Sequence, residues 1–493
     1  MKHIVLSCLL LFVALHCYGQ DPFAEYEKFK QQARQSYNDF RKKCNEEYAE
    51  FMRKPWIETE PSPVIPKPKD DTVPPVVTPK EDIPPVSPEP QPIPYDEVIP
   101  APQPQPQPQP VEPIKEIPVT PVAPVQPTVS FIFFGTEDKV RFDKKYTIRL
   151  SALNENAIAD AWLKLSEESF TNLVHDCLNI RERYDLCDWA YLMMLQKMSE
   201  AICGKGTNEA MLLMAYVYCQ SGYQMRLAFG KDKLYMMFAS QHVIFNWNYY
   251  IIDGVYYYMF GNAADDVRIC LQSYPKEKSM SLVIGKEQKF ALISTDSSSH
   301  QSTRNSEMAV TMTANKNMLD FYSTYPTSKI GTNVVTRWAM YANTPMPDNV
   351  KKQVYPQLIQ AIGDTDQLSA VNKILNWVQT GFEYGYDDKV WGYDRAFFPE
   401  ESLHYPYCDC EDRSILLTRI VRDVLGLKCI LIFYPGHLAA AVEITEGNPT
   451  GDYIEYGGHR FFIADGTIIG YGAPVGATMR GMDNATAKII LLE

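Results

Sequence analysis

Positive charge and long apolar runs are both scarce in this chain of 493 residues. Lys and Arg number 47 against 60 Asp and Glu, which gives a formal net charge of −13. A nucleic-acid-binding protein needs a basic face to neutralise phosphates, so this balance argues against that class. Beyond the N-terminus no stretch has eighteen unbroken apolar residues, which argues against an integral membrane protein.

Dense cysteine spacing is also lacking, although the chain has 11 cysteines. Residues 1–20 predict an export signal, because a short apolar run from Ile4 to Leu15 precedes small residues near Gly19. Acylation of Cys17 is the alternative, and the bulky His16 before it disfavours a lipoprotein. We therefore expect a periplasmic, cell-surface or secreted protein. Nine cysteines remain after cleavage, and an odd number leaves at least one free thiol, either a buried apolar group or a nucleophile.

Two non-globular segments come next. Residues 21–56 predict one amphipathic helix, whose stripe of Tyr, Phe and Ala would dock on the body or on a second copy. Residues 57–127 are rich in proline, which occupies every second position from Pro102 to Pro110. No packed core forms from such a composition, so we predict a disordered polyproline II linker that holds the body away from the helix.

The remaining chain reads as an α+β body with an internal duplication. Residues 128–265 and 346–493 each show a helix, a glycine stop and β-rich segments, and residues 266–345 predict a β-rich connector. An offset of 204 places Gly206 against Cys410, and a further gap of eight places Asp253-Gly254 against Asp465-Gly466. These coincidences favour two copies of one unit.

Three residues of the second copy can carry thiol chemistry. Cys410 begins an apolar helical pattern that ends at Gly426, so it lies at a helix N-terminus, where a thiolate is stabilised. The adjacent acids oppose the thiolate, and a cationic partner is required. His437 opens a later strand, and Asp465 closes the returning one. If the intervening loop folds symmetrically, residues whose numbers sum to about 902 face each other, which pairs His437 with Asp465.

The pattern Cys-Glu-Asp-Arg-Ser from Cys410, then Gly-His at His437, then Asp-Gly at Asp465, resembles the transglutaminase-like superfamily of papain-fold thiol enzymes. The resemblance covers about residues 350–480 and reaches the first copy only through the repeat. It implies a nucleophile helix packed on an antiparallel sheet and a Cys410, His437, Asp465 triad. It also implies amide hydrolysis or transfer to an amine, on a peptide or protein, with no cofactor or metal. The Gly466-Thr467 sequence departs from the proline that relatives often have there.

The first copy departs further from this pattern. Gly206 stands in place of the nucleophile and Lys233 in place of the histidine, and only Asp253 remains. We therefore expect this copy to be degenerate and unable to perform thiol catalysis. It would shape a groove or bind a ligand.

Other interpretations of the three residues stay open. Cys410 can be an inert buried thiol, Cys408, Cys410 and His437 can bind zinc, and Asp465 can cap the turn that follows it. The leading expectation is an exported cysteine peptidase or amidase. The alternatives are a catalytically silent binding or scaffold protein of the same fold and an amine-transferring cross-linker.

Overall fold

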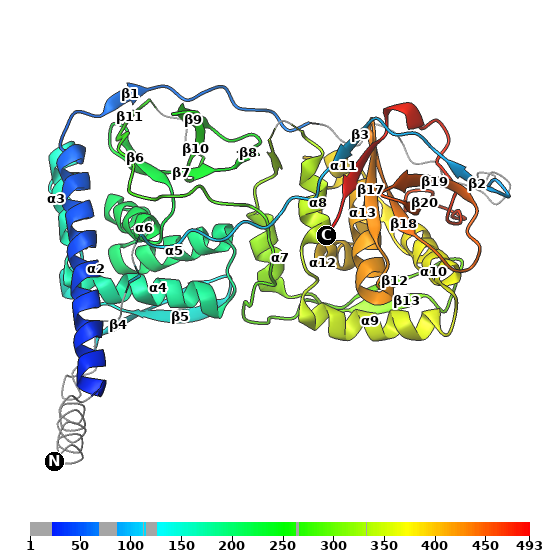
Figure 1. The fold of residues 1–493 in the computed structure, drawn as a ribbon, viewed down its shortest axis with the longest axis horizontal. Helices are drawn as coiled ribbons and strands as arrows, with labels where there is room; N and C mark the ends of the chain where they lie inside the picture. The colour runs from blue at the N-terminus through cyan, green and yellow to red at the C-terminus, as the bar shows by residue number, and fades with distance from the viewer. Residues whose placement is uncertain (1–21, 69–85, 112, 115–125, 263–265, 332) are drawn as a thin grey trace, which may run out of the picture.

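The structure is a computed structural model that describes residues 22–68, 86–111, 113–114, 126–262, 266–331 and 333–493. It has a mixed α+β architecture, in which two helix-and-sheet units lie side by side with α7 and α8 between them (Figure 1). The predicted export signal lies outside the described residues. Across those residues, no helix is both long and apolar enough for a membrane crossing.

The first unit has four helices on one side of a six-stranded antiparallel sheet of order β1-β11-β6-β7-β10-β9. α6 contacts β6 and β7 of this sheet, and α4 and α5 contact a separate hairpin of β4 and β5. Its helices are α3 (Glu155–Leu165), α4 (Thr171–Arg183), α5 (Asp188–Cys203) and α6 (Asn208–Gln220). Its strands are β1 (Ile57–Thr59), β4 (Thr128–Phe133), β5 (Thr136–Arg141), β6 (Met225–Phe229), β7 (Leu234–Ser240), β8 (His242–Ile244), β9 (Tyr249–Ile252), β10 (Val255–Met259) and β11 (Val267–Ile269).

The predicted β-rich connector is mixed, because it contains two helices as well as strands. It comprises β12 (Ser298–Gln301), β13 (Ala309–Met312), α7 (Lys316–Ser323), β14 (Ser328–Ile330) and α8 (Thr336–Asn343). β14 pairs with β8 of the first unit, and β13 packs against α9 of the second. The connector therefore joins the two units rather than forming a separate domain.

The second unit holds α13 against a seven-stranded sheet of order β2-β19-β20-β18-β17-β21-β3. Its helices are α9 (Asp348–Ile362), α10 (Gln367–Thr380), α11 (Asp387–Val390), α12 (Pro399–His404) and α13 (Cys410–Ile420). Its strands are β2 (Pro90–Pro92), β3 (Glu97–Ile99), β15 (Glu383–Tyr384), β16 (Tyr407–Cys408), β17 (Cys429–Tyr434), β18 (His437–Glu443), β19 (Gly451–Tyr456), β20 (His459–Ala464) and β21 (Lys488–Leu491).

The two sheets repeat one topology. The order β11-β6-β7-β10-β9 in the first unit corresponds to β21-β17-β18-β20-β19 in the second, and a helix, α6 or α13, precedes the first central strand in each. All of these pairings are antiparallel. In both units the later strand of the terminal hairpin lies inside and the earlier strand outside. This shared order agrees with the internal duplication.

The residue matches expected between the copies are wrong. The order of elements places Asn208, the first residue of α6, at the position of Cys410, and Leu234, the first residue of β7, at that of His437. Asp253 lies in the turn between β9 and β10, whereas the counterpart of Asp465 is Phe260, directly after β10. The offset of 204 itself is nearly kept, because α6, β6, β7, β9 and β10 begin 202 to 204 residues before their counterparts α13, β17, β18, β19 and β20. The added gap of eight is what wrongly placed Asp253 against Asp465.

The expectation of a detached proline-rich linker is wrong for the described parts of residues 57–127. β1 adds to the edge of the first sheet through β11, and β2 and β3 add in parallel to the two edges of the second sheet. The segment therefore runs from the first unit to the second (Figure 1). Proline lacks an N–H, but an edge strand needs to pair on one side only, so proline-rich chain is tolerated there.

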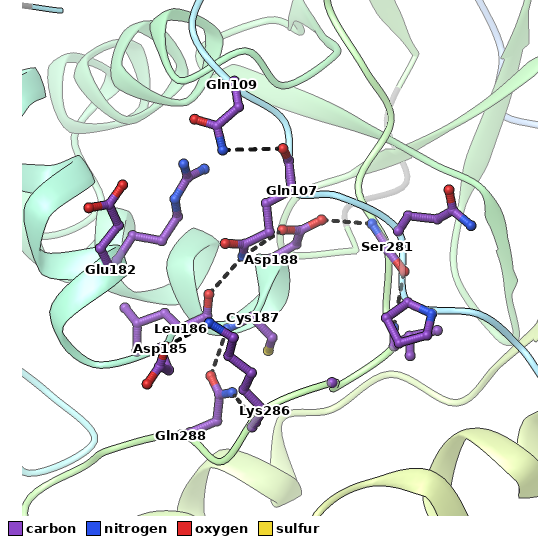
Figure 2. Close-up of a pocket in the computed structure, with 15 residues that line it drawn as sticks. Gln107, Gln109, Glu182, Asp185, Leu186, Cys187, Asp188, Ser281, Lys286 and Gln288 are labelled. Atoms are coloured by element: carbon purple, nitrogen blue, oxygen red, sulfur yellow. Dashed lines mark hydrogen bonds and ion pairs between the residues drawn. The ribbon is translucent and has the colours of Figure 1, made fainter. Parts of the chain in front are cut away.

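The Pro-Gln repeat crosses back over the first unit and forms part of the wall of a cavity of about 440 Å³ (Figure 2). Gln107 donates from Nε2 to the Leu186 carbonyl at 2.8 Å and to Asp188 Oδ1 at 3.1 Å. The buried Arg181 donates to the Pro108 carbonyl at 3.0 Å. Side-chain hydrogen bonds thus replace the backbone donors that the prolines lack.

The N-terminal helix α2 (Pro22–Met52) docks on the first unit through its C-terminal half. Cys44, Tyr48 and Met52 are buried, and Asn45 accepts a hydrogen bond from Trp162 Nε1 at 2.9 Å. The side chains of the predicted stripe before residue 38 lie outside the described set. The described half docks on the body.

Candidate active site

Cys410 is the first residue of α13, as the sequence predicts. Asp409 is the N-cap in an extended conformation, and a capping box with Asp412 holds this end, with the Asp409 N–H donating to Asp412 Oδ2 at 3.4 Å. After α13 a π-helical turn continues to Leu425, and Gly426 ends it in the left-handed conformation with φ 68°. The helix dipole therefore points its positive end at the Cys410 sulfur.

His437 and Asp465 form a buried hydrogen-bonded pair. Nε2 of His437 lies 2.9 Å from Oδ2 of Asp465, and their side chains are 1% and 2% exposed. His437 begins β18 after a two-residue turn, and Asp465 directly follows β20. Asp465 also caps the turn that follows it, because Asp465 Oδ1 accepts from the Thr467 N–H at 2.9 Å. One carboxylate thus holds the turn and the imidazole together.

The strand register that brings this pair together differs from the expected one. β18 and β20 pair Ala440 with Ala464 and Ala441 with Ile463, so facing residues sum to 904 rather than 902. Asp465 therefore falls opposite Ala439, one diagonal step from His437 on the same face. A shift of two residues keeps the side-chain face because the pleat has a period of two. The segment between the two strands, which we expected to be a loop, instead contains the outer strand β19.

The first turn of α13 lies on the start of β18. Ser414 Oγ donates to the Leu438 carbonyl at 3.0 Å, one residue beyond His437. Ser414 is four residues after Cys410 and hence one turn along the same side of the helix. The helix therefore presents Cys410 toward the end of the sheet that carries His437. Ala439, Ala440 and Ala441 are fully buried, and such small side chains permit a close approach of the helix.

The end of β20 is anchored to two helices. Gln379 of α10 donates from Nε2 to the Asp465 carbonyl at 2.8 Å, and Arg413 of α13 donates to the Gly466 carbonyl at 3.3 Å. A Cβ at Gly466 would lie 3.1 Å from both Arg413 Cβ and Val378 Cγ1, so only glycine fits this close approach without a shift. These contacts set the position of the Asp465 carboxylate relative to α13.

A cluster of buried carboxyl groups reaches the sulfur through Glu411. The Cys410 thiol donates to Glu411 Oε2 at 3.2 Å. Oxygen atoms of Asp387, Asp409 and Glu411 lie within 4.8 Å of one another. Burial, then the charge of Glu411, raises the pKa of Asp387 to about 8, and burial raises that of Asp412 well above its usual value. Protons or a cation must offset this crowding of acids.

The zinc interpretation is not supported by the geometry. Within the described residues, the group of three metal-ligand side chains that lie this close together is the carboxyl trio, and Cys408, Cys410 and His437 do not form such a group. Burial raises the pKa of Cys408 to about 11 despite the nearby charge of Arg413, so a protonated thiol is favoured there.

The first unit has a small cavity where the second has the three residues. This cavity of about 210 Å³ is lined by Asn208, Leu234 and Phe260, the topological counterparts of Cys410, His437 and Asp465, together with Lys233 and Gly206. Asn208 Oδ1 accepts from the Leu234 N–H at 2.9 Å, which ties the helix to the strand. No cysteine is among the residues that line this cavity, so the position of the Cys410 thiol has no thiol counterpart there.

Sequence reasoning identified the three principal residues but missed the groups that position them. Gln379 lies in a helix whose pattern carried no chemical signal, and Asp387 begins the short helix α11, 22 residues before Asp409. Arg413 belongs to the Cys-Glu-Asp-Arg-Ser motif. Its buried guanidinium group donates to backbone carbonyls, which indicates a positioning role. No protein-family model, curated protein or solved structure matches the chain.

Proposed function

We propose that the protein is an exported thiol enzyme of transglutaminase-like type that hydrolyses peptide or isopeptide amides. The observation that carries this proposal is the buried His437–Asp465 pair, 2.9 Å apart, at the sheet end on which the N-terminus of the Cys410 helix rests. An ordered nucleophile, base and orienting acid is the arrangement that acyl transfer requires.

Each residue has one role in the proposed mechanism. Asp465 holds Nε2–H of the imidazole, so proton exchange with the sulfur falls to Nδ1 of His437. The Cys410 thiol gives its proton to Nδ1, and the sulfur attacks the amide carbonyl. The positive end of α13 stabilises the oxyanion, with the Cys410 N–H as a donor. His437 then protonates the leaving amine, and water releases the acyl group from the sulfur.

A catalytically silent binding protein is the second candidate, and burial of the site favours it. Cys410, His437 and Asp465 are only 2%, 2% and 3% exposed. The carboxylate of Glu411 beside the sulfur also favours the protonated thiol over the thiolate. An enzyme with this site therefore needs the loop that carries Asp387 to move before an amide can reach the sulfur.

The test compares Cys410→Ala with Cys203→Ala, which removes a half-buried thiol of the first unit. The proteins are treated with a thiol-directed acyl probe, and the labelled residue is identified by mass spectrometry. We expect the wild type and Cys203→Ala to be labelled at Cys410, and Cys410→Ala to be unlabelled at an unchanged unfolding midpoint.

Equal labelling of Cys410→Ala and the wild type would contradict the enzyme proposal. A second assay supplies a glutamine peptide with and without a primary amine. Release of ammonia or of a peptide fragment supports the hydrolase, whereas formation of an amine conjugate would replace it with the cross-linker.

A further inference from the structure

A cavity of about 860 Å³ lies between the two units, next to the candidate active site. Its walls come from the proline-rich segment, from the chain around Trp247, from the segment after α7 and from the loop that includes α11. The largest part of the polar lining is on the loop that contains Asp387 and Asp394. The cavity thus adjoins the second unit on the side of its buried carboxyl groups.

Lys67 of the proline-rich segment lines this cavity. Its Nζ donates to the backbone carbonyl of Asp394 and lies 3.6 Å from Asp394 Oδ2. The Lys67 side chain is only 12% exposed. Its backbone is held to the first unit, because the Lys67 N–H donates to Asn246 Oδ1 at 3.2 Å and the Asn246 N–H donates to the Ile65 carbonyl at 2.8 Å. The ammonium group of Lys67 is therefore largely removed from water, and both its Nζ and its backbone are held by hydrogen bonds.

The charges around this ammonium group are predominantly negative. Burial lowers the pKa of Lys67, while Asp394, Asp387 and Glu411 act in the opposite direction and only Arg337 adds to the lowering. These charges reduce the cost of burying the ammonium group but do not cancel it, because the pKa of Lys67 remains lowered. The preference for a cation rests on geometry, because Nζ donates to the Asp394 carbonyl and lies near the Asp394 carboxylate, and a neutral side chain would remove this donor.

The acidic cavity is connected to the sulfur through two carboxyl groups. Asp387 lines the cavity, its carboxylate lies within 4.8 Å of that of Glu411, and Glu411 Oε2 lies 3.2 Å from Cys410 Sγ. Glu411 is 1% exposed, and its Oε1 accepts no hydrogen bond from any described residue. A buried acceptor without a donor costs free energy, so this arrangement suits a ligand that supplies one.

We infer that this cavity is the subsite for a cationic side chain of the substrate, and that Lys67 engages Asp394 in its acidic wall as an internal competitor. The inference rests on the proposed function, because it assigns a substrate class to the same site. Lys67 belongs to neither helix-and-sheet unit, so the fold of both units is complete without its side chain. Withdrawal of Lys67 would leave the acidic walls open to a lysine or arginine of a peptide.

The experiment uses the mature chain and two chloromethyl ketone probes that differ only in carrying lysine or norleucine. The variants are Lys67→Met, which keeps the length of the side chain, and Lys67→Arg, which keeps the charge. Lys54→Met serves as control, because it removes an exposed lysine before the first unit. The rate of labelling at Cys410 is measured for each protein with each probe.

We expect Lys67→Met to react with the lysine probe about tenfold or more faster than with the norleucine probe, since a charged hydrogen bond in such a site discriminates by at least this factor. The wild type, Lys67→Arg and Lys54→Met should react slowly and with little preference. Asp394→Asn combined with Lys67→Met should lose the preference. Equal rates of the two probes with Lys67→Met would overturn the inference.

A binding measurement separates failure of the inference from failure of the proposed function. N-acetyl-lysine amide is titrated calorimetrically into the double variant Lys67→Met with Cys410→Ala, with N-acetyl-norleucine amide as the comparison. Preferential binding of the lysine compound supports the subsite even if no variant is labelled at Cys410. Such a lack of labelling would contradict only the enzyme proposal. Absence of that preference overturns the subsite even if labelling proceeds.

Discussion

The two units of this protein share the order of their central strands and differ at one end of the sheet. In the second unit the helix start and the neighbouring strand ends carry Cys410, His437 and Asp465, whereas the first unit has Asn208, Leu234 and Phe260 there. The first unit shows that the same order of strands forms without a cysteine, a histidine and an aspartate at these positions. Since burial of an imidazole and a carboxylate costs desolvation free energy, the fold alone gives no reason for the pair in the second unit.

The proline-rich segment distinguishes the units in a second way. On the first unit it supplies β1 and forms part of the wall of a cavity through Gln107. On the second it supplies both edge strands of the sheet, and Lys67 reaches the acidic loop at the boundary between the units. The first unit thus serves as an anchor for the segment, and the second unit is the one whose candidate site it approaches.

The largest expected effect compares the residues that begin the equivalent strands β18 and β7. His437→Ala should lower the rate of acyl chemistry by about 10²–10⁴, because the general acid–base group is lost. Leu234→Ala should leave the rate unchanged and destabilise the protein by about 2–5 kcal/mol, because a buried leucine leaves a cavity. Turnover and denaturant unfolding of both variants test this, and a loss of rate in Leu234→Ala would remove the distinction between the units.

The next effect compares a buried acid of each unit as the pH changes. Burial raises the pKa of Glu400 to about 8, so the folded state holds its proton more tightly than the unfolded state does. The stability that this proton provides is complete below about pH 4.5 and is lost as the pH rises toward 8. Glu400→Gln should therefore be more stable than the wild type at pH 8, by at most about 4 kcal/mol, and similar to it at pH 5.

Asp188 is the contrasting acid of the first unit. It accepts hydrogen bonds from Tyr223, Ser281 and Gln107, whereas Glu400 accepts one, from the Asn315 N–H. An asparagine would place an N–H₂ group against some of these donors, so Asp188→Asn should lose about 1–3 kcal/mol at both pH values. Thermal unfolding at pH 5 and 8 checks both variants, and a stabilised Asp188→Asn at pH 8 would refute the contrast.

The smallest effect compares the ion pairs that flank the added edge strands. Glu97 on β3 lies 2.7 Å from Lys488, and Glu58 on β1 lies 3.2 Å from Arg268, with the first pair less exposed. Glu97→Gln and Glu58→Gln should each cost less than about 1 kcal/mol, because solvent screens such pairs. Urea unfolding should show the larger cost for Glu97→Gln, and equal costs would mean that the two edges hold the segment alike.

Much of the candidate site was accessible from local patterns. The helix from Cys410 to Gly426 follows from apolar periodicity and a glycine stop, and the strands that begin at His437 and end before Asp465 follow from β-rich runs around a turn. The expectation that His437 and Asp465 lie on one face of the sheet also held, although the expected register was wrong. The match of Asp253 with Asp465 failed because it assumed a gap of eight residues, whereas the corresponding helices and strands keep nearly one offset up to β10 and β20.

The buried acids could not be assembled in the same way. Asp387, Asp409 and Glu411 meet because the loop before α12 folds back on the start of α13, where Asp412 accepts from the Phe397 N–H. Lys67 reaches them from more than 300 residues away along the chain. No periodic pattern encodes such contacts, because they depend on the path of loops and not on the face of a helix or strand.

The amino-acid sequence by itself determined the places of the thiol, the imidazole and the carboxylate within their own elements, since hydrophobic periods of 3.6 and 2 act over a few residues. Tertiary structure alone decided which open sheet edges the prolines would cover and which acids would gather beside the sulfur. An unpaired edge accepts any chain that can present carbonyls or N–H groups to it, so its partner is selected by the packing of the whole molecule.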